Sequence, residues 1–444
     1  MSDKHAMTRR RALQTALFGT GLVGLQALAT GLPPEVFGPL GLRALEARAA
    51  EPRERQFLLM LTSSSGEPLN AGAPGVYGIP GVDTNPHPEM AETPLSLGAV
   101  ATSAAAPWAS LPQWVLDRTA FVHHRTYQNA HPQYAKVMRL VGSARDANGS
   151  GVEFLPSVIA SETASSLLTV QREPIRMSGN NEELGFEGKP VQRIRPSTLA
   201  EVFEVPEGPE EIALANIRAR ALDDIARLAR DRGTPTQRAL LDQFATSRAQ
   251  VQELDETLLA RLAMIDGDDA QNQLNAALTL FLMNLAPVVT VRLAFGGDNH
   301  GDADLSDERD DTVESVGLLR TFFEELDASP IRDRVVVANL DVFGRTLERN
   351  SRGGRDHNLN HHVMMISGAG VNPGVHGRLA PSGNDFGATA IDSQTGQGSE
   401  GADIPETETL EAAAKTLGAA VGIDESRLEV RIEGGKVIRP VVSG

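Results

Sequence analysis

The chain has 444 residues, a formal net charge of −17 at pH 7, 4% aromatic residues and no cysteine. The acidic charge disfavours nucleic acid and anionic membrane surfaces as partners, and without cysteine the chain forms no disulfide and offers no thiolate to a metal. The core must be built from Leu, Val, Ala and Ile, and the length allows one large α/β domain or two medium ones.

The N-terminal segment has the pattern of an export signal. The arginines Arg9 to Arg11 precede an uncharged apolar stretch over residues 12–32, and an Ala-Arg-Ala sequence ends at Ala49. Glycines interrupt the stretch and make it a weak membrane anchor. We predict a twin-arginine (Tat) signal peptide over residues 1–49, export to the periplasm or out of the cell, and no stable membrane span after cleavage. A transmembrane anchor and an ordinary amphipathic helix are the alternatives.

The first half of the remaining chain predicts two strands, a long surface loop and three helices. The strand segments are continuously apolar, which is typical of strands buried on both faces of a parallel sheet. The loop is rich in Gly, Pro, Ala and Ser. The two long helices repeat apolar residues at helical spacing, and we expect them to form a helical insertion at about 207–264. In chain order these elements are a strand at 55–61, the loop over 67–107, a strand at 119–123, a helix through 134–138, and helices over 207–232 and 236–264.

The second half alternates helices and strands. This alternation predicts an α/β fold with a mainly parallel sheet and helices on both faces, within one domain over 50–444. In chain order the expected elements are a helix at 271–285, a strand at 288–295, a helix at 307–326, strands at 335–340 and 363–366, a loop over 380–406, a helix at 409–421, and a hairpin over 427–441 that turns at Gly434-Gly435.

Histidines and carboxylates gather where the expected strands end. His123 and His124 follow one strand, Asp298 and His300 follow another, and Asp341 follows a third. Ligands of such sheets bind beyond the carboxyl ends of the strands, so we expect these side chains to converge on one site. Neither a GxGxxG pattern nor a P-loop accompanies the strands, which leaves nucleotide phosphate binding without support.

The spacing of these residues suggests metal binding. Asp298 and His300 are two positions apart on an expected turn, which lets both reach one ion, and an Asp356-His357 pair lies in a glycine-rich loop. Imidazole and carboxylate ligands suit zinc, or manganese and iron in sites richer in oxygen. The ordinary alternative is that Asp298 caps a turn and that the histidines are solvated surface residues.

A run of acidic residues suggests calcium binding as one interpretation. Six carboxylates lie between Asp302 and Asp311, but the run lacks the glycine and the terminal glutamate of an EF-hand. Much of it lies just before or in the first turn of the expected helix at 307–326, where the helix dipole favours carboxylates. We therefore interpret the run as the start of that helix.

At these motifs the chain resembles the domain of unknown function 1501 (DUF1501) family, Tat-exported bacterial proteins of the alkaline phosphatase and sulfatase-like superfamily. The family motifs Gly-Trp-Asp-Thr-His, Ser-Glu-Phe-Gly-Arg-Thr and Gly-x-Asp-His-Gly read here as Gly296–His300, Asp341–Thr346 and Gly354–Asn358. The resemblance covers most of 50–444 and is strongest over 288–378.

The resemblance implies an alkaline-phosphatase-like three-layer sandwich with one or two metals at strand ends. Its metal ligands correspond to Asp298, His300 and His357, with Asp341 and Asp356 as further candidates. From the ligand types we expect zinc first, with manganese, iron and calcium as alternatives.

The catalytic groups implied by the resemblance are less complete. The candidate nucleophiles after the first strand are Ser63 and Ser64, with Thr62 and Ser65 as neighbours, and Arg345 would stabilise oxyanion charge. The family's glutamate in the second motif is Val342 here, which implies a degraded second metal site.

Two functions follow as hypotheses. The first is an exported metal-dependent hydrolase that acts on phosphate or sulfate esters, either small molecules or polymers. The second is a non-catalytic exported binding or scaffold protein on the same fold, motivated by the departures from the family pattern at Val342, Gly297 and Pro68.

Overall fold

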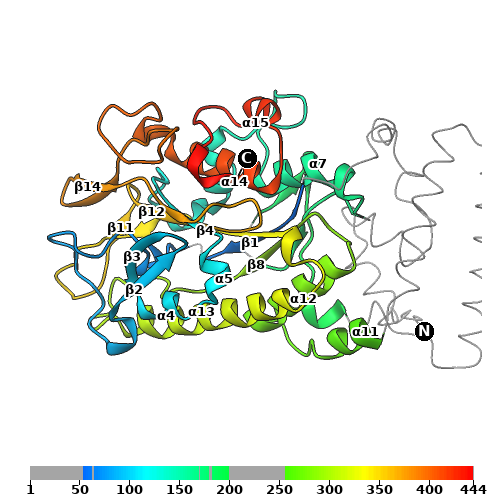
Figure 1. Ribbon diagram of the computed structural model, residues 1–444, viewed down its shortest axis with the longest axis horizontal. Coiled ribbons are helices and arrows are strands. Elements are labelled where there is room, and N and C mark those ends of the chain that lie inside the picture. The colour runs from blue at the N-terminus through cyan, green and yellow to red at the C-terminus, as the bar shows by residue number, and fades with distance from the viewer. Residues whose placement is uncertain (1–53, 63–64, 170, 180–182, 200–255, 444) are drawn as a thin grey trace, which may run out of the picture.

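A seven-stranded sheet lies at the centre of the computed structural model, which describes residues 54–62, 65–169, 171–179, 183–199 and 256–443 (Figure 1). The strand order is β13-β4-β12-β9-β1-β8-β5. All pairings are parallel except those of β12, which runs antiparallel to both of its neighbours. The predicted α/β fold with a mainly parallel sheet is therefore confirmed. The strands are β1 Gln56–Leu61, β4 Thr119–His124, β5 Ile175–Arg176, β8 Val288–Arg292, β9 Val335–Leu340, β12 His362–Gly368 and β13 Gly374–His376.

The central strands are apolar because both of their faces are covered. Every residue of β1, β4, β9 and β12 is buried. In β1, Leu58 and Met60 belong to one hydrophobic cluster, whereas Leu59 and Leu61 belong to the other. This alternation follows from the two-residue period of a strand, and it explains why the sequence shows continuous apolar runs.

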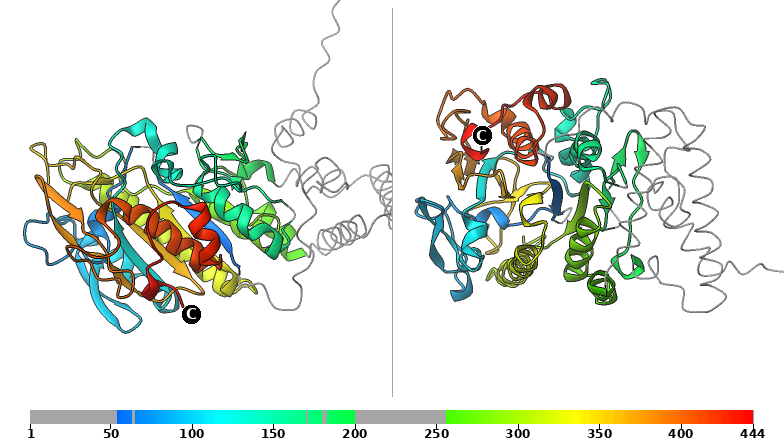
Figure 2. Two further views of the ribbon diagram at one scale, coloured as in Figure 1. Left: turned by 90° about the horizontal axis from the view of Figure 1, so that it is seen from above. Right: turned by 45° about the vertical axis from the view of Figure 1, so that its right-hand side comes forward.

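Helices form a layer on each side of the sheet (Figures 1 and 2). One layer contains α4 Ala106–Ala109, α5 Gln113–Leu116, α12 Ala270–Leu282 and α13 Ser306–Asp327. The other contains α6 Tyr134–Met138, α7 Leu155–Leu167, α14 Thr409–Val421 and α15 Glu425–Arg431. The predicted helices at 134–138, 271–285, 307–326 and 409–421 are confirmed by these bounds, whereas α7 was not predicted.

The segment predicted as a long loop contains regular structure. The β2–β3 hairpin lies within residues 67–107, and Leu95 and Leu97 on its first strand are buried. Pro94 and the many small residues of β3 hide this alternation in the sequence, because they resemble turn residues. The elements of the segment are α3 Leu69–Gly72, η2 Pro88–Met90, β2 Glu92–Leu97 and β3 Val100–Ala105, followed by α4.

The predicted C-terminal hairpin is wrong, because residues 425–431 form the helix α15. Leu428 and Ile432 are buried in the cluster that includes α14, whereas Val430 between them is 59% exposed. A strand would place all three on one face, so this pattern is helical. The predicted loop over 380–406 also contains a short hairpin. The remaining elements are β6 Gly185–Phe186, β7 Lys189–Pro190, β10 Gly344–Arg345, β11 His357–Asn358, β14 Leu379–Ser382, β15 Asp385–Ala388, η3 His131–Gln133, η4 Leu140–Gly142, η5 Pro196–Thr198, α11 Glu256–Ala263, η6 Arg332–Arg334, η7 Glu406–Glu408 and η8 Arg439–Val441.

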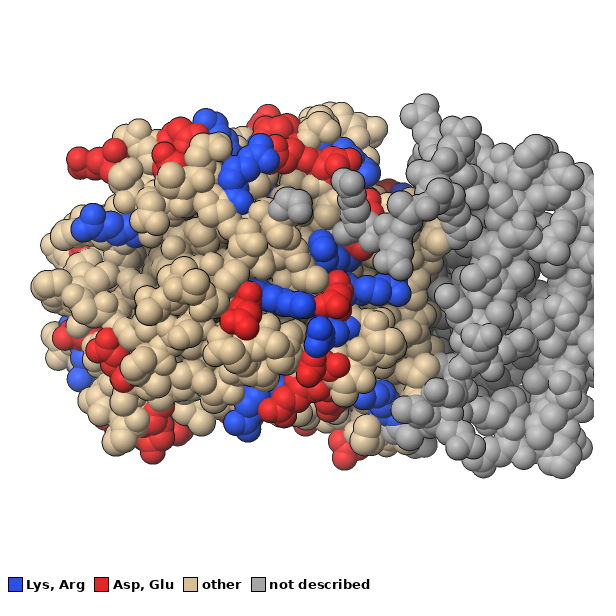
Figure 3. Space-filling model, viewed as in Figure 1, with Lys and Arg blue, Asp and Glu red and all other residues tan. Residues whose placement is uncertain are grey.

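Some predictions fall on residues that the structure does not describe. The signal peptide over 1–49, the helix at 207–232 and residues 236–255 of the helix at 236–264 lie outside the described residues. The end of that second helix is described and forms α11. Among the described helices none is both long and apolar enough to cross a membrane. On the face drawn in Figure 3, basic and acidic side chains are interspersed and form no separate basic patch.

Candidate metal centre

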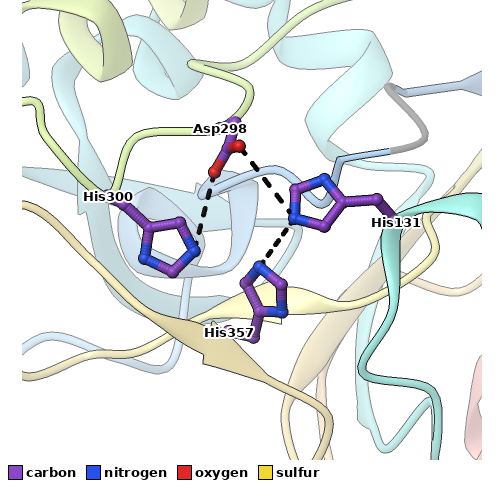
Figure 4. A group of neighbouring side chains, drawn as sticks. All are labelled: His131, Asp298, His300 and His357. Atoms are coloured by element: carbon purple, nitrogen blue, oxygen red, sulfur yellow. Dashed lines mark hydrogen bonds and ion pairs between the residues drawn. The ribbon is translucent and has the colours of Figure 1, made fainter.

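Four side chains come together beyond the ends of the central strands: His131, Asp298, His300 and His357 (Figure 4). Each offers one ligand atom, and these atoms all lie within 4.8 Å of one another. Within the described part of the chain, no other group of three or more His, Asp or Glu residues meets this spacing. We call these four residues the metal-ligand cluster.

The loop after β8 carries two members of the cluster, and a buried carboxylate fixes its course. Glu67 accepts hydrogen bonds from the backbone N–H of Phe295 at 2.7 Å and of Gly297 at 2.6 Å. At Gly296, φ is 117° and an added Cβ would lie 2.7 Å from the Cα of Glu308, so only glycine fits the close approach of the loop to α13. The loop therefore turns sharply and presents Asp298 to the other cluster residues.

The other two members come from separate parts of the chain. His357 begins β11, which pairs with β10 so that His357 lies opposite Arg345. His131 begins η3, between β4 and α6. Phe343 packs against both imidazoles, with ring centroids 4.2 Å from His357 and 5.6 Å from His131. This aromatic contact holds the two rings side by side.

Hydrogen bonds at the outer nitrogens orient two of the imidazoles. His300 Nδ1 lies 2.7 Å from Asp356 Oδ1, and His357 Nδ1 lies 3.1 Å from Asn129 Oδ1. Because these oxygens accept hydrogen bonds, Nδ1 is the nitrogen that donates to them, and Nε2 is the nitrogen that faces the cluster. Metal-binding histidines show this same arrangement.

The inner atoms face one another at separations that bracket those between the ligands of a bound cation. His131 Nε2 lies 2.9 Å from His357 Nε2, His300 Nε2 lies 3.6 Å from Asp298 Oδ1, and His131 Nε2 lies 4.0 Å from Asp298 Oδ2. Ligand atoms about 2.0–2.1 Å from a tetrahedral zinc ion lie roughly 3.4 Å from one another. The donor set of three imidazoles and one carboxylate therefore fits a divalent metal such as zinc.

The charge state of one imidazole also suits a metal ligand. Burial, together with the positive charge of Arg345, lowers the pKa of His357 to about 4. The ring is therefore neutral near pH 7, with its lone pair available, as metal coordination requires.

Arg345 lies beside the cluster but faces protein atoms. Its side chain is fully buried, and it donates to Asp298 Oδ1 at 3.0 Å, Ser65 O at 2.6 Å and Gly66 O at 3.3 Å. A weaker contact of 3.4 Å reaches the carbonyl of Arg355. The guanidinium therefore fixes Asp298, and its donors are already paired within the protein.

The two further carboxylates predicted as ligands occupy different places. Asp356 contacts the far side of His300 and also accepts from Asn350 Nδ2 at 2.9 Å, so it orients a ligand. These hydrogen bonds hold the pKa of Asp356 below its usual value. Asp341 is fully buried, with its nearest imidazole at His362, 3.6 Å away, and burial raises its pKa to about 7. Neither residue belongs to the metal-ligand cluster.

The predicted nucleophiles cannot be placed, since Ser63 and Ser64 lie outside the described residues. The acidic run before α13 caps that helix, because Asp302 accepts from the backbone N–H of Ser306 and Asp307 at 2.9 and 3.1 Å. The interpretation of the run as a helix start is therefore confirmed.

The sequence did not identify His131 as a member of the cluster. Its only signal was the loose similarity of Asn129-Ala130-His131 to a family segment. The histidines at the end of β4 and around the start of β12 lie apart from the cluster. His123 of β4 and His361, directly before β12, form a buried pair with 3.0 Å between Nδ1 and Nε2.

Comparison with protein-family models gave one match. Residues 213–394 match the family described as "Protein of unknown function (DUF1501)", a range that includes Asp298, His300 and His357. A search of the curated proteins found no match. Over residues 213–394 the chain is therefore similar to the DUF1501 family, which supports the resemblance shown by its motifs.

Proposed function

We propose that the protein is an exported metal-dependent hydrolase of phosphate or sulfate esters that binds one divalent ion at the metal-ligand cluster. The observation that carries the proposal is the convergence of three imidazoles and one carboxylate in a place that solvent reaches. The side chains of His131 and His300 are 35% exposed and that of Asp298 is 48% exposed. A substrate can therefore approach the ligand atoms. Zinc is the metal we expect first, and manganese, iron and calcium are alternatives.

A divalent ion held here would supply the positive charge that polarises an ester oxygen and lowers the pKa of water. The chain's own residues hold and orient it: Asp356 fixes the ring of His300, Asn129 fixes that of His357, and Arg345 holds Asp298. The fixed guanidinium of Arg345 also opposes a second cation on its side of Asp298. We therefore propose one metal per chain.

Two further observations support this proposal. The alkaline-phosphatase-like sandwich that the motifs imply requires a mainly parallel sheet between two layers of helices, and the observed α/β architecture is compatible with it. The cluster also lies beyond the strand ends, where such sheets bind ligands. The twin-arginine pattern at Arg9 to Arg11 supports export to the periplasm or out of the cell.

A second candidate is a non-catalytic exported binding or scaffold protein. The observation that favours it is the presence of four protein ligands, since four ligands fill a tetrahedral shell, as in structural zinc sites. Catalytic zinc sites usually have three protein ligands and leave one position for water. In this case the metal would stabilise the loops without turning over a substrate.

Turnover distinguishes the two candidates. The full chain, loaded with zinc or manganese, would be tested on a panel of phosphate and sulfate esters, alongside His357→Ala and the control His87→Ala. His87 contacts Arg309 and the carbonyl of Asp304 and is not part of the cluster. We expect turnover by the wild type and by His87→Ala, and loss of at least about 100-fold in His357→Ala. Metal binding with no turnover on any ester would support the scaffold function, and turnover by His357→Ala equal to that of the wild type would contradict the proposed site.

A further inference from the structure

The two loops that carry Asp298, His300 and His357 lie directly against each other. The N–H of Arg355 donates to the carbonyl of Asn299 at 3.2 Å, and a Cβ added to Gly354 would collide with the carbonyl oxygens of Asn299 and His300. The loops therefore meet backbone to backbone, so a small displacement of one would separate the ligands that they carry.

A fully buried ion pair lies beneath this contact. Arg355 and Glu308 are 0% and 1% exposed, and Arg355 Nε donates to Glu308 Oε2 at 2.7 Å. Glu308 is in the first turn of α13, directly after the loop that carries Asp298 and His300. Arg355 immediately precedes the Asp356-His357 segment. The pair thus joins the two ligand-bearing loops at their bases.

Both partners make further hydrogen bonds that fix the loops. Arg355 also donates to the carbonyls of Thr346 at 3.0 Å, Leu347 at 3.1 Å and Asp83 at 2.8 Å. Glu308 Oε2 accepts from Asn299 Nδ2 at 3.4 Å. Asn299 lies between Asp298 and His300 in the sequence, so this contact reaches the ligand-bearing turn itself.

The energetics of a buried ion pair point away from a purely stabilising role. Removing two charges from water is costly, and replacing such a pair by apolar side chains is often neutral or stabilising. The pair instead fixes how the two loops lie relative to each other, since a planar guanidinium and a carboxylate constrain both the distance and the angle between them.

We propose that the Glu308–Arg355 ion pair is the positioning element of the metal-ligand cluster. It sets the separation between the Asp298–His300 turn and the segment that carries His357, and thereby the affinity for a divalent metal. The effect on affinity rests on the proposed metal site, whereas the positioning of the loops does not.

The test compares Glu308→Gln with a matched variant in a second buried ion pair. Glu162 on α7 pairs with Arg431 on α15, and the two are 7% and 3% exposed. Neither residue of this pair is part of the cluster, so Glu162→Gln removes the same charge in a similarly buried place. The zinc affinity of each full chain would be measured by competition with a chromophoric chelator, and the Tm of each would be measured without metal.

We expect both variants to lower the Tm, but only Glu308→Gln to weaken zinc binding, by about 10- to 100-fold. If Glu308→Gln does not fold, Asn299→Ala serves in its place, because it removes the contact from Glu308 to the turn and leaves the ion pair intact. An unchanged zinc affinity in the variant measured, or an equal loss in Glu162→Gln, would overturn the proposal.

If the wild type binds no metal, the proposed function fails, and hydrogen exchange of the metal-free chains then decides the positioning role. Faster exchange of the amides at 298–300 and 355–357 in Glu308→Gln than in Glu162→Gln would support it. Equal exchange in the two variants would overturn it.

Discussion

At the scale of single residues, His300 shows how a charged neighbour turns an ordinary imidazole into a directed ligand. Its Nδ1 faces Asp356 at 2.7 Å and its Nε2 faces Asp298 at 3.6 Å. The hydrogen bond to Asp356 fixes the direction of the ring, so Nε2 points into the cluster before any cation arrives.

Replacing Asp356 therefore tests whether orientation matters. We expect Asp356→Ala to weaken zinc binding by about 10- to 100-fold, because His300 loses the acceptor at Nδ1. Asp356→Asn retains an oxygen that can accept this hydrogen bond, and we expect a smaller loss. Chelator competition measures both variants, with the exposed Asp310→Ala as the control. Equal affinity of Asp356→Ala and the wild type would show that the hydrogen bond does not position the ring.

At the scale of elements, the pairing of β4 with β12 buries two pairs of histidines on opposite faces of the sheet. His124 lies opposite His362, and His123 forms its hydrogen bond with His361. Burial lowers the pKa of His123 to about 4, and that of His124 and His362 to about 3. These rings remain neutral in the native protein well below the pH at which a free histidine is protonated.

This burial predicts a loss of stability in mild acid. Well above pH 6.5 the histidines are neutral in both the native and the unfolded chain, so they add no pH dependence. As the pH falls from about 6.5 towards 4, the unfolded chain takes up protons and the native chain does not, which favours unfolding by about 1.4 kcal/mol per pH unit for each such histidine.

Urea unfolding of the metal-free chain at several pH values measures this effect. We expect His124→Gln to reduce the slope of the free energy of unfolding against pH, because one fewer histidine takes up a proton only in the unfolded chain. A free energy of unfolding that stays constant between pH 7 and pH 5 would contradict the account of these strands.

At the scale of the whole molecule, the sequence predicted the layers better than the connections. The strands β1, β4, β8, β9 and β12 were predictable because strands buried on both faces are continuously apolar. The helix α15 and the β2–β3 hairpin were not, since short segments of alternating or small residues fit more than one structure.

The metal-ligand cluster was also predictable only in part. Asp298 and His300 were predictable because they follow a strand, and strand ends meet at one edge of a parallel sheet. His357 was grouped with them by its Asp-His pair in a glycine-rich loop and by the motif that resembles the family's. His131 lies 226 residues before His357 in the chain, and only the packing of η3 against Phe343 brings it there. The place of Asp356 behind His300 depends on side-chain direction, which spacing alone does not give.

The number of zinc ions bound per chain tests directly whether the metal-ligand cluster binds a metal. The full chain and its Asp298→Ala and His357→Ala variants would be loaded with zinc, desalted and analysed by elemental mass spectrometry, with His87→Ala as the control. We predict about one zinc per chain for the wild type and the control, because the cluster offers one set of converging ligands. We predict loss of that zinc in both cluster variants. A wild type without zinc, or cluster variants that retain it fully, would show that these four residues do not form the metal site.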